Sequence, residues 1–525
     1  MKILDSAPNL SKTALLAVLA ITSGLALASA TRPVAGDGGG KLGFTNYEVA
    51  GNPFVTGYGV GTICPNSLMN CINTEGEPQI RADNAGNFYG SSENVFCVIG
   101  GLCGGTFAFK STDNGQHFTT LPLPNSVSEC DPSTGECFGR VGYSPAGGDT
   151  DLAVAPQKNE NGLYNLYVAS LASLRTGLVN IFVSSSRNGG QSWFINPTSA
   201  SIPIDDREWI AADSVDKVCI SYHAVSLTNT IFVNCSTDGG LTFGPGTTAF
   251  DANHPYFSEF NNFLGNIAIN PNSHVIYQIF AAIASPADLV CDQTSDCLHS
   301  VWVAVSTDGG LTFTDHPIYV NPSLTITYDH QFPSIAVDRA GNVYAAFSDN
   351  HNVYYSFSRD AGTAWSPPRQ VNKTPANTAI FPWVAAGANG GIDIVYYGTS
   401  YYDGVNPPDS YPMKASWYVY FAQNLQATSP TSSFIQTRAS GIVHYGGVCE
   451  SGAFCTGNRD LLDDFGVAAS PTTGKAAIIY TSDQYVNSAA EPANPFGSRA
   501  CTPAGTNTIN CEHTNIAVQS SGLGV

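Results

Sequence analysis

The sequence predicts an all-β fold: a β-propeller of seven blades, each a four-stranded antiparallel sheet, with six blades as the alternative. Three observations predict it, namely a composition rich in turn-forming residues, a turn motif that occurs five times, and a strand pair that occurs seven times. The 525 residues include 52 Gly and 31 Pro, and only 12% are charged. A hydrophobic content of 43% with so little charge excludes a disordered chain or a coiled coil, and the many turn residues disfavour long helices.

The turn motif is an octapeptide of the form Ser-x-Asp-x-Gly-x-x-aromatic. Two copies read STDGGLTF, and another has Asn in place of Asp. Each copy follows a short β-rich run, so we expect a turn between two strands in which Asp or Asn accepts hydrogen bonds from turn amides, Gly supplies a positive φ, and the aromatic ring packs on the sheet. We expect these Asp residues to be structural. The copies span Ser111–Phe118, Ser186–Trp193, Ser236–Phe243, Ser306–Phe313 and Ser358–Trp365.

The second repeat pairs a small apolar strand with another strand about ten residues later, and its period of roughly 50 to 80 residues suits propeller blades rather than a solenoid. It occurs seven times. The second position of the first strand is Arg81 in unit one and Ala in the other six units. Small side chains there fit sheets that crowd around an axis. The six alanines are Ala153, Ala211, Ala268, Ala336, Ala385 and Ala468.

The N-terminus has the pattern of a secretory signal peptide. Lys2 and Lys12 precede the apolar run 14–28, and Ala28-Ser29-Ala30 has the small-x-small form at which signal peptidases cut. A membrane anchor is the alternative. We therefore expect a secreted, extracellular or periplasmic protein with three parts. These are a signal peptide over 1–30, an N-terminal extension over 31–76 and the propeller over 77–525.

Cysteine use agrees with export. The chain has 14 Cys and no Cys-x-x-Cys, and pairing of sequence neighbours would give seven local disulfides. A cysteine-based metal site is the alternative, disfavoured because His is not interleaved at zinc-ligand spacing. The predicted pairs are Cys64–Cys71, Cys97–Cys103, Cys130–Cys137, Cys219–Cys235, Cys291–Cys297, Cys449–Cys455 and Cys501–Cys511.

The charge balance limits the partners. The chain has 41 acidic and 21 basic residues, and its formal net charge is −20. Such a chain repels phosphate backbones and anionic membrane surfaces, so we expect neither nucleic acid nor, after signal cleavage, a membrane as partner.

The octapeptides resemble the Asp-boxes, also called BNR repeats, of sialidase-like β-propellers, and the resemblance covers about residues 77 to 518. That superfamily includes sialidases, other glycan-cleaving enzymes and non-catalytic receptors such as sortilin. The resemblance implies a glycan-active enzyme, a glycoside hydrolase acting on an acidic sugar or polysaccharide. A non-catalytic extracellular propeller that binds glycan or protein, and a polysaccharide lyase, remain alternatives. No cofactor is implied, with Ca²⁺ as an alternative.

The resemblance also implies a functional end of the axis, where the first strands begin. Acid, amide or imidazole side chains precede six of the seven first strands, although Asp and Asn are also favoured as turn caps. The sialidase arginine motif Phe/Tyr-Arg-Ile-Pro is replaced here by Pro78-Gln-Ile-Arg81-Ala. The candidate catalytic residues are Asp151, Asp206, Tyr445 and Asp463. The candidate substrate-binding residues are Arg81, Arg207, Trp209, His330, Trp383 and Arg459.

Arg81 stands in the slot that holds Ala elsewhere. A guanidinium there must reach the channel or an acidic partner, because burial without a partner is costly. We expect either a clamp for a sugar carboxylate, a task that suits the bidentate guanidinium, or a structural pair with Glu77 or a neighbouring Asp.

Two further segments carry candidate chemistry. The segment 444–465 concentrates His, Tyr, Arg and acids, and could supply an acid/base pair or oxygen ligands for Ca²⁺, or could be a disulfide-pinned loop with an Arg459–Asp463 salt bridge. We expect His223, beside Tyr222, to be a packed strand histidine, although a His and Tyr pair is also what a lyase needs. No metal site is predicted from spacing.

Overall fold

The computed structural model describes residues 32–34, 42–48, 75–94, 106–124, 148–173, 179–227, 229–258, 262–291, 298–388, 390–452, 455, 458–484 and 513–525. The predicted signal peptide lies outside these residues. No helix among the described residues has the length and apolar character needed to cross a membrane.

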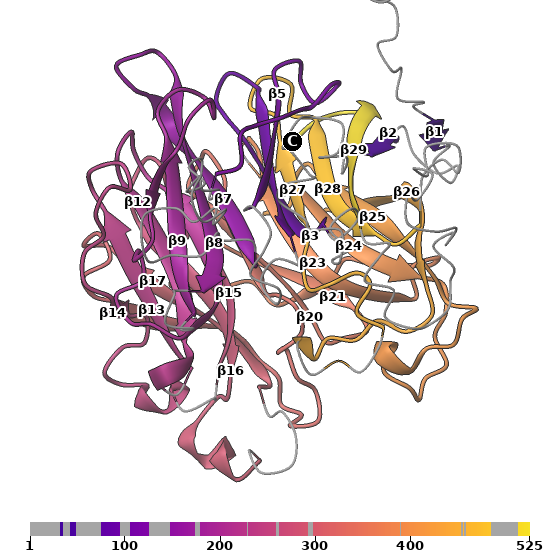
Figure 1. Ribbon diagram of the computed structural model, residues 1–525. Helices are drawn as coiled ribbons and strands as arrows, with labels where there is room; N and C mark the ends of the chain where they lie inside the picture. Colours follow the sequence, from indigo (N-terminus) through magenta and orange to yellow (C-terminus); the bar gives the residue numbers. More distant parts are fainter. Residues whose placement is uncertain are drawn as a thin grey trace, which may run out of the picture.

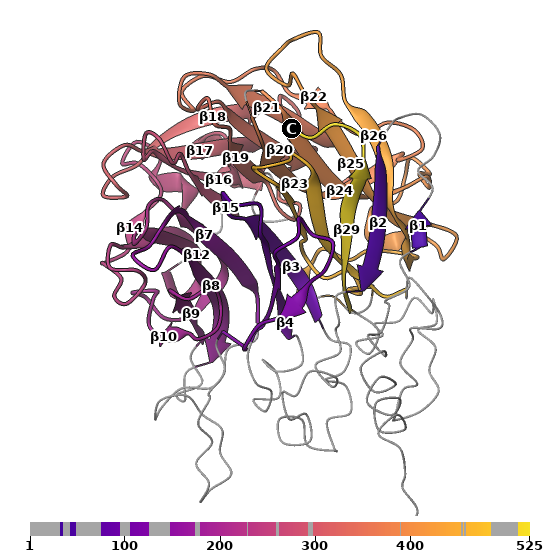
Figure 2. The same cartoon turned by 90° about the horizontal axis from the view of Figure 1, so that it is seen from above.

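Seven antiparallel sheets form a closed ring, which confirms the seven-bladed propeller (Figure 1, Figure 2). In each sheet the first strand lies nearest the axis and contacts the first strand of the next sheet. The ring closes where β27 contacts β3, and Figure 1 shows the indigo β3 beside the yellow β27 and β28.

The strands follow the chain blade by blade. Blade one contains β3 (Glu75–Ala82), β4 (Phe88–Asn94), β5 (Phe107–Ser111) and β6 (Thr119–Thr120). Blade two contains β7 (Thr150–Lys158), β8 (Tyr164–Ser173), β9 (Val179–Ser186) and β10 (Phe194–Asn196). Blade three contains β11 (Asp205–Ala212), β12 (Val218–Ala224), β13 (Thr230–Ser236) and β14 (Thr247–Thr248). Blade four contains β15 (Asn262–Ile269), β16 (Ile276–Ala282), β17 (Ser300–Ser306) and β18 (Thr314–Val320).

The remaining elements complete the ring. Blade five contains β19 (Ser334–Val337), β20 (Val343–Ser348), β21 (Val353–Ser358) and β22 (Arg369–Gln370). Blade six contains β23 (Thr378–Ala386), β24 (Ile392–Thr399), β25 (Ser416–Asn424) and β26 (Ile435–Tyr445). Blade seven contains β27 (Gly466–Ala469), β28 (Ala476–Ser482), β29 (His513–Ser521), β2 (Gly43–Glu48) and β1 (Arg32–Val34). The helical elements of the described residues are 3-10 turns: η1 (Val225–Leu227), η2 (Pro255–Phe257), η3 (Pro286–Cys291) and η4 (Pro408–Ser410).

The seventh blade joins the two ends of the chain. β29 pairs with β2, and β2 pairs with β1, so part of the segment 31–76 adds strands to this sheet (Figure 2). Phe44 of β2 is buried against Phe421, with ring centroids 4.9 Å apart. Asn46 donates to the carbonyl of Ala439 and accepts from the hydroxyl of Tyr480. This pairing closes the ring, because the last blade is completed by residues that precede the first.

The octapeptides form the turns between the third and fourth strands of blades one to five, as predicted. In each turn the Ser hydroxyl accepts from the Gly amide four residues later at 2.9 Å. The Asp or Asn side chain accepts from the amide four residues further on, at 2.9 to 3.0 Å. These hydrogen bonds account for the conserved form of the motif within this chain and leave the Asp residues a structural role.

Two of the predicted disulfides lie within the described residues. Cys219 and Cys235 join β12 to β13, and Cys449 joins Cys455 in the loop that follows β26. Each of the other five predicted pairs has at least one cysteine outside the described residues.

Candidate functional site

The residues that precede the first strands meet at one end of the axis, opposite the octapeptide turns. In an antiparallel blade the turns after the first and third strands share one end, so the first strands begin at the other end. We use the name entrance cluster for nine charged residues gathered there: Glu77, Glu93, Asp149, Asp206, Arg207, Glu208, Arg459, Asp463 and Asp464.

Arg207 lies at the centre of the entrance cluster, and only 6% of its side chain is exposed. Its Nη2 lies 2.8 Å from Glu77 Oε2 and its Nη1 lies 3.2 Å from Asp464 Oδ1. Its Nε lies 3.4 Å from Asp149 Oδ2, and Nη2 is also 3.5 Å from Asp463 Oδ2. One guanidinium from blade three thus binds carboxylates from blades one, two and seven.

β-bulges turn these side chains toward the axis. The strand register shifts at Glu77 and at Arg207, where φ is 45° and 48°. Phe381 in blade six has the same feature, with φ 55°. A bulge adds one residue to a strand and re-aims its side chain. Strand propensity and the alternation of buried and exposed residues do not reveal an inserted residue. The sequence therefore predicted that these residues lie near the axis, but not which way their side chains point.

Arg459 forms the outer edge of the entrance cluster, with 24% of its side chain exposed. Its Nη2 donates to Asp463 Oδ2 at 2.6 Å and lies 3.5 Å from Glu77 Oε1. The salt bridge expected between Arg459 and Asp463 is therefore present. Asp149 also reaches solvent with 19% of its side chain, and Asp206 is exposed.

The carboxyl groups of the entrance cluster have different environments. Protein packed around Asp206 and the nearby Asp149 carboxylate raise the pKa of Asp206 to about 6, although this residue keeps contact with solvent. Burial raises the pKa of Asp464 to about 7 against the opposing effect of Arg207. Burial and the Asp149 carboxylate raise the pKa of Glu208 well above its usual range, and neither Glu208 oxygen has a hydrogen-bond partner.

An aromatic layer lies under Arg207. The guanidinium carbon is 4.5 Å from the ring centroid of Phe332 and 5.5 Å from that of Trp209. Trp209 is fully buried and packs on Trp383 with centroids 5.1 Å apart. The predicted substrate-binding residues Trp209 and Trp383 therefore lie together at the axis, where they pack against each other.

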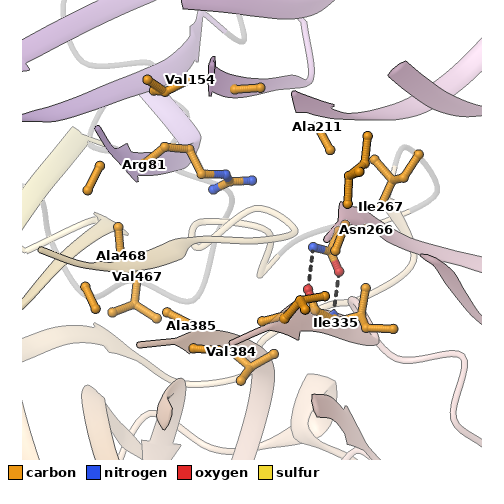
Figure 3. A pocket seen from close by; sticks show the side chains of 18 of the residues that line it. Arg81, Val154, Ala211, Asn266, Ile267, Ile335, Val384, Ala385, Val467 and Ala468 are labelled. Atoms are coloured by element: carbon orange, nitrogen blue, oxygen red, sulfur yellow. Dashed lines mark hydrogen bonds between the residues drawn. The ribbon is translucent and has the colours of Figure 1, made fainter. Parts of the chain in front are cut away.

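Beside this layer, at the axis, lies a cavity of about 310 Å³. Its walls are the inner strands of all seven blades, including the six alanines that the repeat placed at the axis. The Arg81 guanidinium projects into it, as Figure 3 shows, and 24% of that side chain is exposed. Its carbon lies 5.3 Å from the Trp383 ring centroid.

Arg81 also pairs with a neighbouring Asp, which was the alternative to a clamp for a sugar carboxylate. Its Nη2 donates to Asp151 Oδ1 at 2.6 Å, and its Nη1 donates to Gln79 Oε1 at 3.0 Å. Asp151 is buried and also accepts from the amides of Leu152 and Ile210. The predicted catalytic residue Asp151 therefore accepts hydrogen bonds from residues of blades one, two and three.

Besides Arg81, Asp151, Trp209 and Trp383, two more predicted site residues lie outside the entrance cluster. His330 precedes blade five, and its Nδ1 lies 2.8 Å from Glu450 Oε2. Although burial alone would lower the pKa of His330, the Glu450 carboxylate raises it to about 9. Tyr445 lies on β26, the outermost strand of blade six, where it pairs with Ser416. In the segment 444–465, Tyr445 therefore lies at the outer edge of blade six, whereas Arg459 and Asp463 lie in the entrance cluster.

His223 and Tyr222 are both buried in β12. His223 Nε2 lies 2.7 Å from Asn262 Oδ1, and burial lowers the pKa of this histidine to about 4. The Tyr222 hydroxyl donates to Asn234. The pair has the packed, hydrogen-bonded character expected of strand residues.

One member of the entrance cluster, Glu93, was not found from the sequence. It lies at the end of β4, opposite Gly76. In each blade the second strand ends at the same end of the axis at which the first strand begins. An acidic residue at the end of a predicted second strand could therefore have identified Glu93.

Several solved structures resemble this chain at low sequence identity. No family model and no curated protein matches the sequence. A protein of unknown function from Dyadobacter fermentans is 12% identical, with a TM-score of 0.41, over 86% of this chain and 95% of that one. An α-L-arabinofuranosidase of Fusarium graminearum is 11% identical, with a TM-score of 0.40, over 70% and 92%. The NanB sialidase from Streptococcus pneumoniae is 12% identical, with a TM-score of 0.37, over 86% and 68%. Similarity this distant carries no information about activity.

Proposed function

We propose that the chain is a secreted glycoside hydrolase whose acid and base groups are Asp206 and Asp463 of the entrance cluster. The proposal rests on a difference between these two carboxyl groups, which come from different blades. Asp206 is exposed and has a raised pKa, whereas Asp463 is approached by both Arg207 and Arg459. Glycoside hydrolysis uses one carboxyl group that is protonated and one that is ionised.

Asp206 has the properties of the proton donor. It is exposed, and its pKa is raised to about 6, so it still carries a proton in weakly acidic solution. From this position it would protonate the leaving oxygen of a glycosidic bond.

Asp463 is a carboxylate that both guanidinium groups of the entrance cluster approach. Arg459 lies 2.6 Å from its Oδ2 and Arg207 lies 3.5 Å from the same oxygen. Asp463 would then act on the anomeric centre, as nucleophile or as the base that activates water.

The charge of the entrance cluster bears on the substrate. Seven carboxyl side chains surround two guanidinium groups, which leaves an excess of acids. Arg207 is almost completely buried, and Arg459 Nη2 is held by Asp463 at 2.6 Å, so the cluster offers little accessible cation to an anionic ligand. We therefore propose a neutral sugar as the group bound there, rather than the acidic sugar implied by the resemblance to sialidases.

A second candidate function is binding of an acidic glycan without cleavage, and the Arg81 cavity favours it. The guanidinium is the basic group in the lining of this cavity of about 310 Å³, and it keeps 24% of its side chain exposed. A carboxylate-bearing ligand fits an arginine in such apolar surroundings.

Secretion belongs to the same proposal. Two disulfides, Cys219–Cys235 and Cys449–Cys455, are typical of proteins from oxidising compartments. The signal pattern over residues 1–30 supports the same location.

The experiment that separates the candidates is a substrate screen with purified protein. Neutral oligosaccharides and polysaccharides are assayed beside sialosides and uronate-containing glycans, with release of reducing sugar as the readout. We expect hydrolysis of a neutral glycan that is lost in Asp206→Asn and retained in Glu160→Gln, a change at a surface acid. Binding of an acidic glycan without turnover, abolished by Arg81→Ala, would instead support the second candidate.

A further inference from the structure

A group of three metal-ligand side chains lies at the junction of blades three and four, away from the axis. Asp251 and His254 belong to the connection between β14 and η2, and Asp315 belongs to β18. Their ligand atoms all lie within 4.8 Å of one another. His254 Nδ1 lies 3.1 Å from Asp251 Oδ1 and 3.3 Å from Asp315 Oδ2.

The histidine nitrogen lies close to both carboxylates without hydrogen-bond geometry to either. Although both distances are short, His254 Nδ1 has no partner with hydrogen-bond geometry. The ring is fixed by packing, since it stacks on Phe257 with centroids 5.2 Å apart and contacts Trp302 at 5.3 Å. Packing therefore holds Nδ1 close to both carboxylates.

Asp315 supplies a second and independent sign of a missing partner. Its side chain is completely buried, and Oδ1 has no hydrogen-bond partner. Asp315 Oδ2 accepts from the amide of Asp251, and Asp251 Oδ2 accepts from the amide of Asp315, so both carboxylates are oriented by the backbone. No Lys or Arg of the described residues forms an ion pair with either carboxylate.

The distances match one particular kind of ion. Zinc binds imidazole nitrogen and carboxylate oxygen at roughly 2.0 to 2.2 Å, so neighbouring ligands in a tetrahedron lie roughly 3.3 to 3.5 Å apart. His254 Nδ1 lies 3.1 Å from Asp251 Oδ1 and 3.3 Å from Asp315 Oδ2, which is close to this ligand–ligand distance. Ca²⁺ prefers six to eight oxygen ligands at roughly 2.3 to 2.6 Å, and this set includes a nitrogen.

Two other groups of the described residues have ligand atoms equally close together, and both differ in a decisive way. In the group around His444, both ring nitrogens are already used, by Asp483 Oδ2 and by the Gly447 carbonyl. In the group of Glu77, Glu93 and Asp149, the guanidinium of Arg207 lies within 3.4 Å of two of the three carboxylates. Of these three groups among the described residues, the set at Asp251 alone combines a histidine nitrogen that makes no hydrogen bond with carboxylates that no guanidinium approaches.

We propose that Asp251, His254 and Asp315 bind one Zn²⁺ ion, with a water molecule at the fourth position. His254 keeps 22% of its side chain exposed, which provides access for the ion and a place for that water. The site would fasten the segment leaving blade three to the outermost strand of blade four. This inference does not depend on the proposed hydrolase activity, because the site lies outside the entrance cluster.

The test is metal binding by the full protein after removal of ions with a chelator. Co²⁺ is added as a spectroscopic probe, because tetrahedral Co²⁺ absorbs strongly in the visible range, and Zn²⁺ affinity is then measured by calorimetry. We expect one ion per chain, and a rise in melting temperature with Zn²⁺. Asp251→Asn and His254→Gln should each weaken binding at least about tenfold.

A matched control is His274→Gln. His274 also contacts an aspartate, Asp213, at 2.6 Å, but it is 57% exposed and Lys217 pairs with the same carboxylate. This variant should bind Zn²⁺ like the unchanged protein. If His254→Gln does not fold, Asp251→Asn decides. No binding by the unchanged protein at micromolar Zn²⁺, or equal binding by a folded Asp251→Asn variant, would overturn the proposal in favour of a simple His–Asp ion pair.

Discussion

Arg207 Nη2 lies 2.8 Å from Glu77 Oε2, although the two residues are 130 positions apart and belong to different blades. Both side chains are almost completely buried, and three other carboxylates surround the same guanidinium. Arg207 therefore compensates a concentration of negative charge that no blade could bury alone.

Replacing Arg207 with Met should destabilise the protein strongly. The change leaves Glu77 and Asp464 buried without their cation, and removing one partner of a buried ion pair typically costs about 3–5 kcal/mol. Urea unfolding followed by circular dichroism measures the loss. Arg187→Met is the control, since Arg187 forms its ion pairs at the surface, and it should change stability little. Equal stability of the two variants would show that the entrance cluster does not depend on Arg207.

Asp206→Asn should separate activity from stability. The folded-state pKa of about 6 lies above the ordinary value for Asp, so the ionised carboxylate is disfavoured in the fold at neutral pH. Asn removes that unfavourable charge, and the melting temperature at pH 7 should stay the same or rise. Turnover should fall about 10²–10⁴-fold, because the proton donor is lost. A variant that loses stability and activity together would indicate a structural role for Asp206.

His330 should stabilise the protein in a defined pH range. Its pKa is about 9 in the folded protein against an ordinary value of 6.5, so its contribution is complete below about pH 6.5 and is lost as the pH rises through 9. His330→Gln should therefore cost about 1–3 kcal/mol at about pH 6, the range for hydrogen bonds to charged groups, and little above pH 9. Unfolding free energies of both proteins across this range provide the check. A difference that does not change with pH would rule out the Glu450 pair as its cause.

Phe44→Ala should weaken ring closure. Phe44 is 2% exposed in β2 and packs on Phe421. Removing a buried Phe ring typically costs about 3–5 kcal/mol. The melting temperature should fall accordingly, and limited proteolysis should become faster at the junction of blades six and seven. An unchanged melting temperature would mean that β2 contributes little to the closed ring.

The sequence predicted the fold because each blade repeats the same two signals. The octapeptide turns and the alanines at the axis depend on local backbone geometry and on close packing, which leave a pattern in the chain. β2 leaves no such pattern, since it is a single strand whose partner, β29, is more than 450 residues away. Its place in blade seven was therefore not predicted.

The candidate site was predicted only in part. The entrances of the first strands did identify Asp206, Arg207 and Asp463, which meet in the entrance cluster. Tyr445 was grouped with them by sequence proximity, but strand β26 carries it to the rim. Which acids share one arginine depends on bulges and on the order of blades around the axis, and neither follows from one segment of sequence.

The pH dependence of glycan hydrolysis is the decisive measurement for the proton-donor role of Asp206. With a neutral oligosaccharide as substrate, turnover by the unchanged protein should fall as the pH rises through about 6, the pKa of Asp206. Asp206→Asn should lose this limb together with most of its activity, while Glu160→Gln keeps both. The same profile and rate in Asp206→Asn would exclude Asp206 as the proton donor, and no hydrolysis of any neutral glycan by the unchanged protein would exclude the proposed hydrolase.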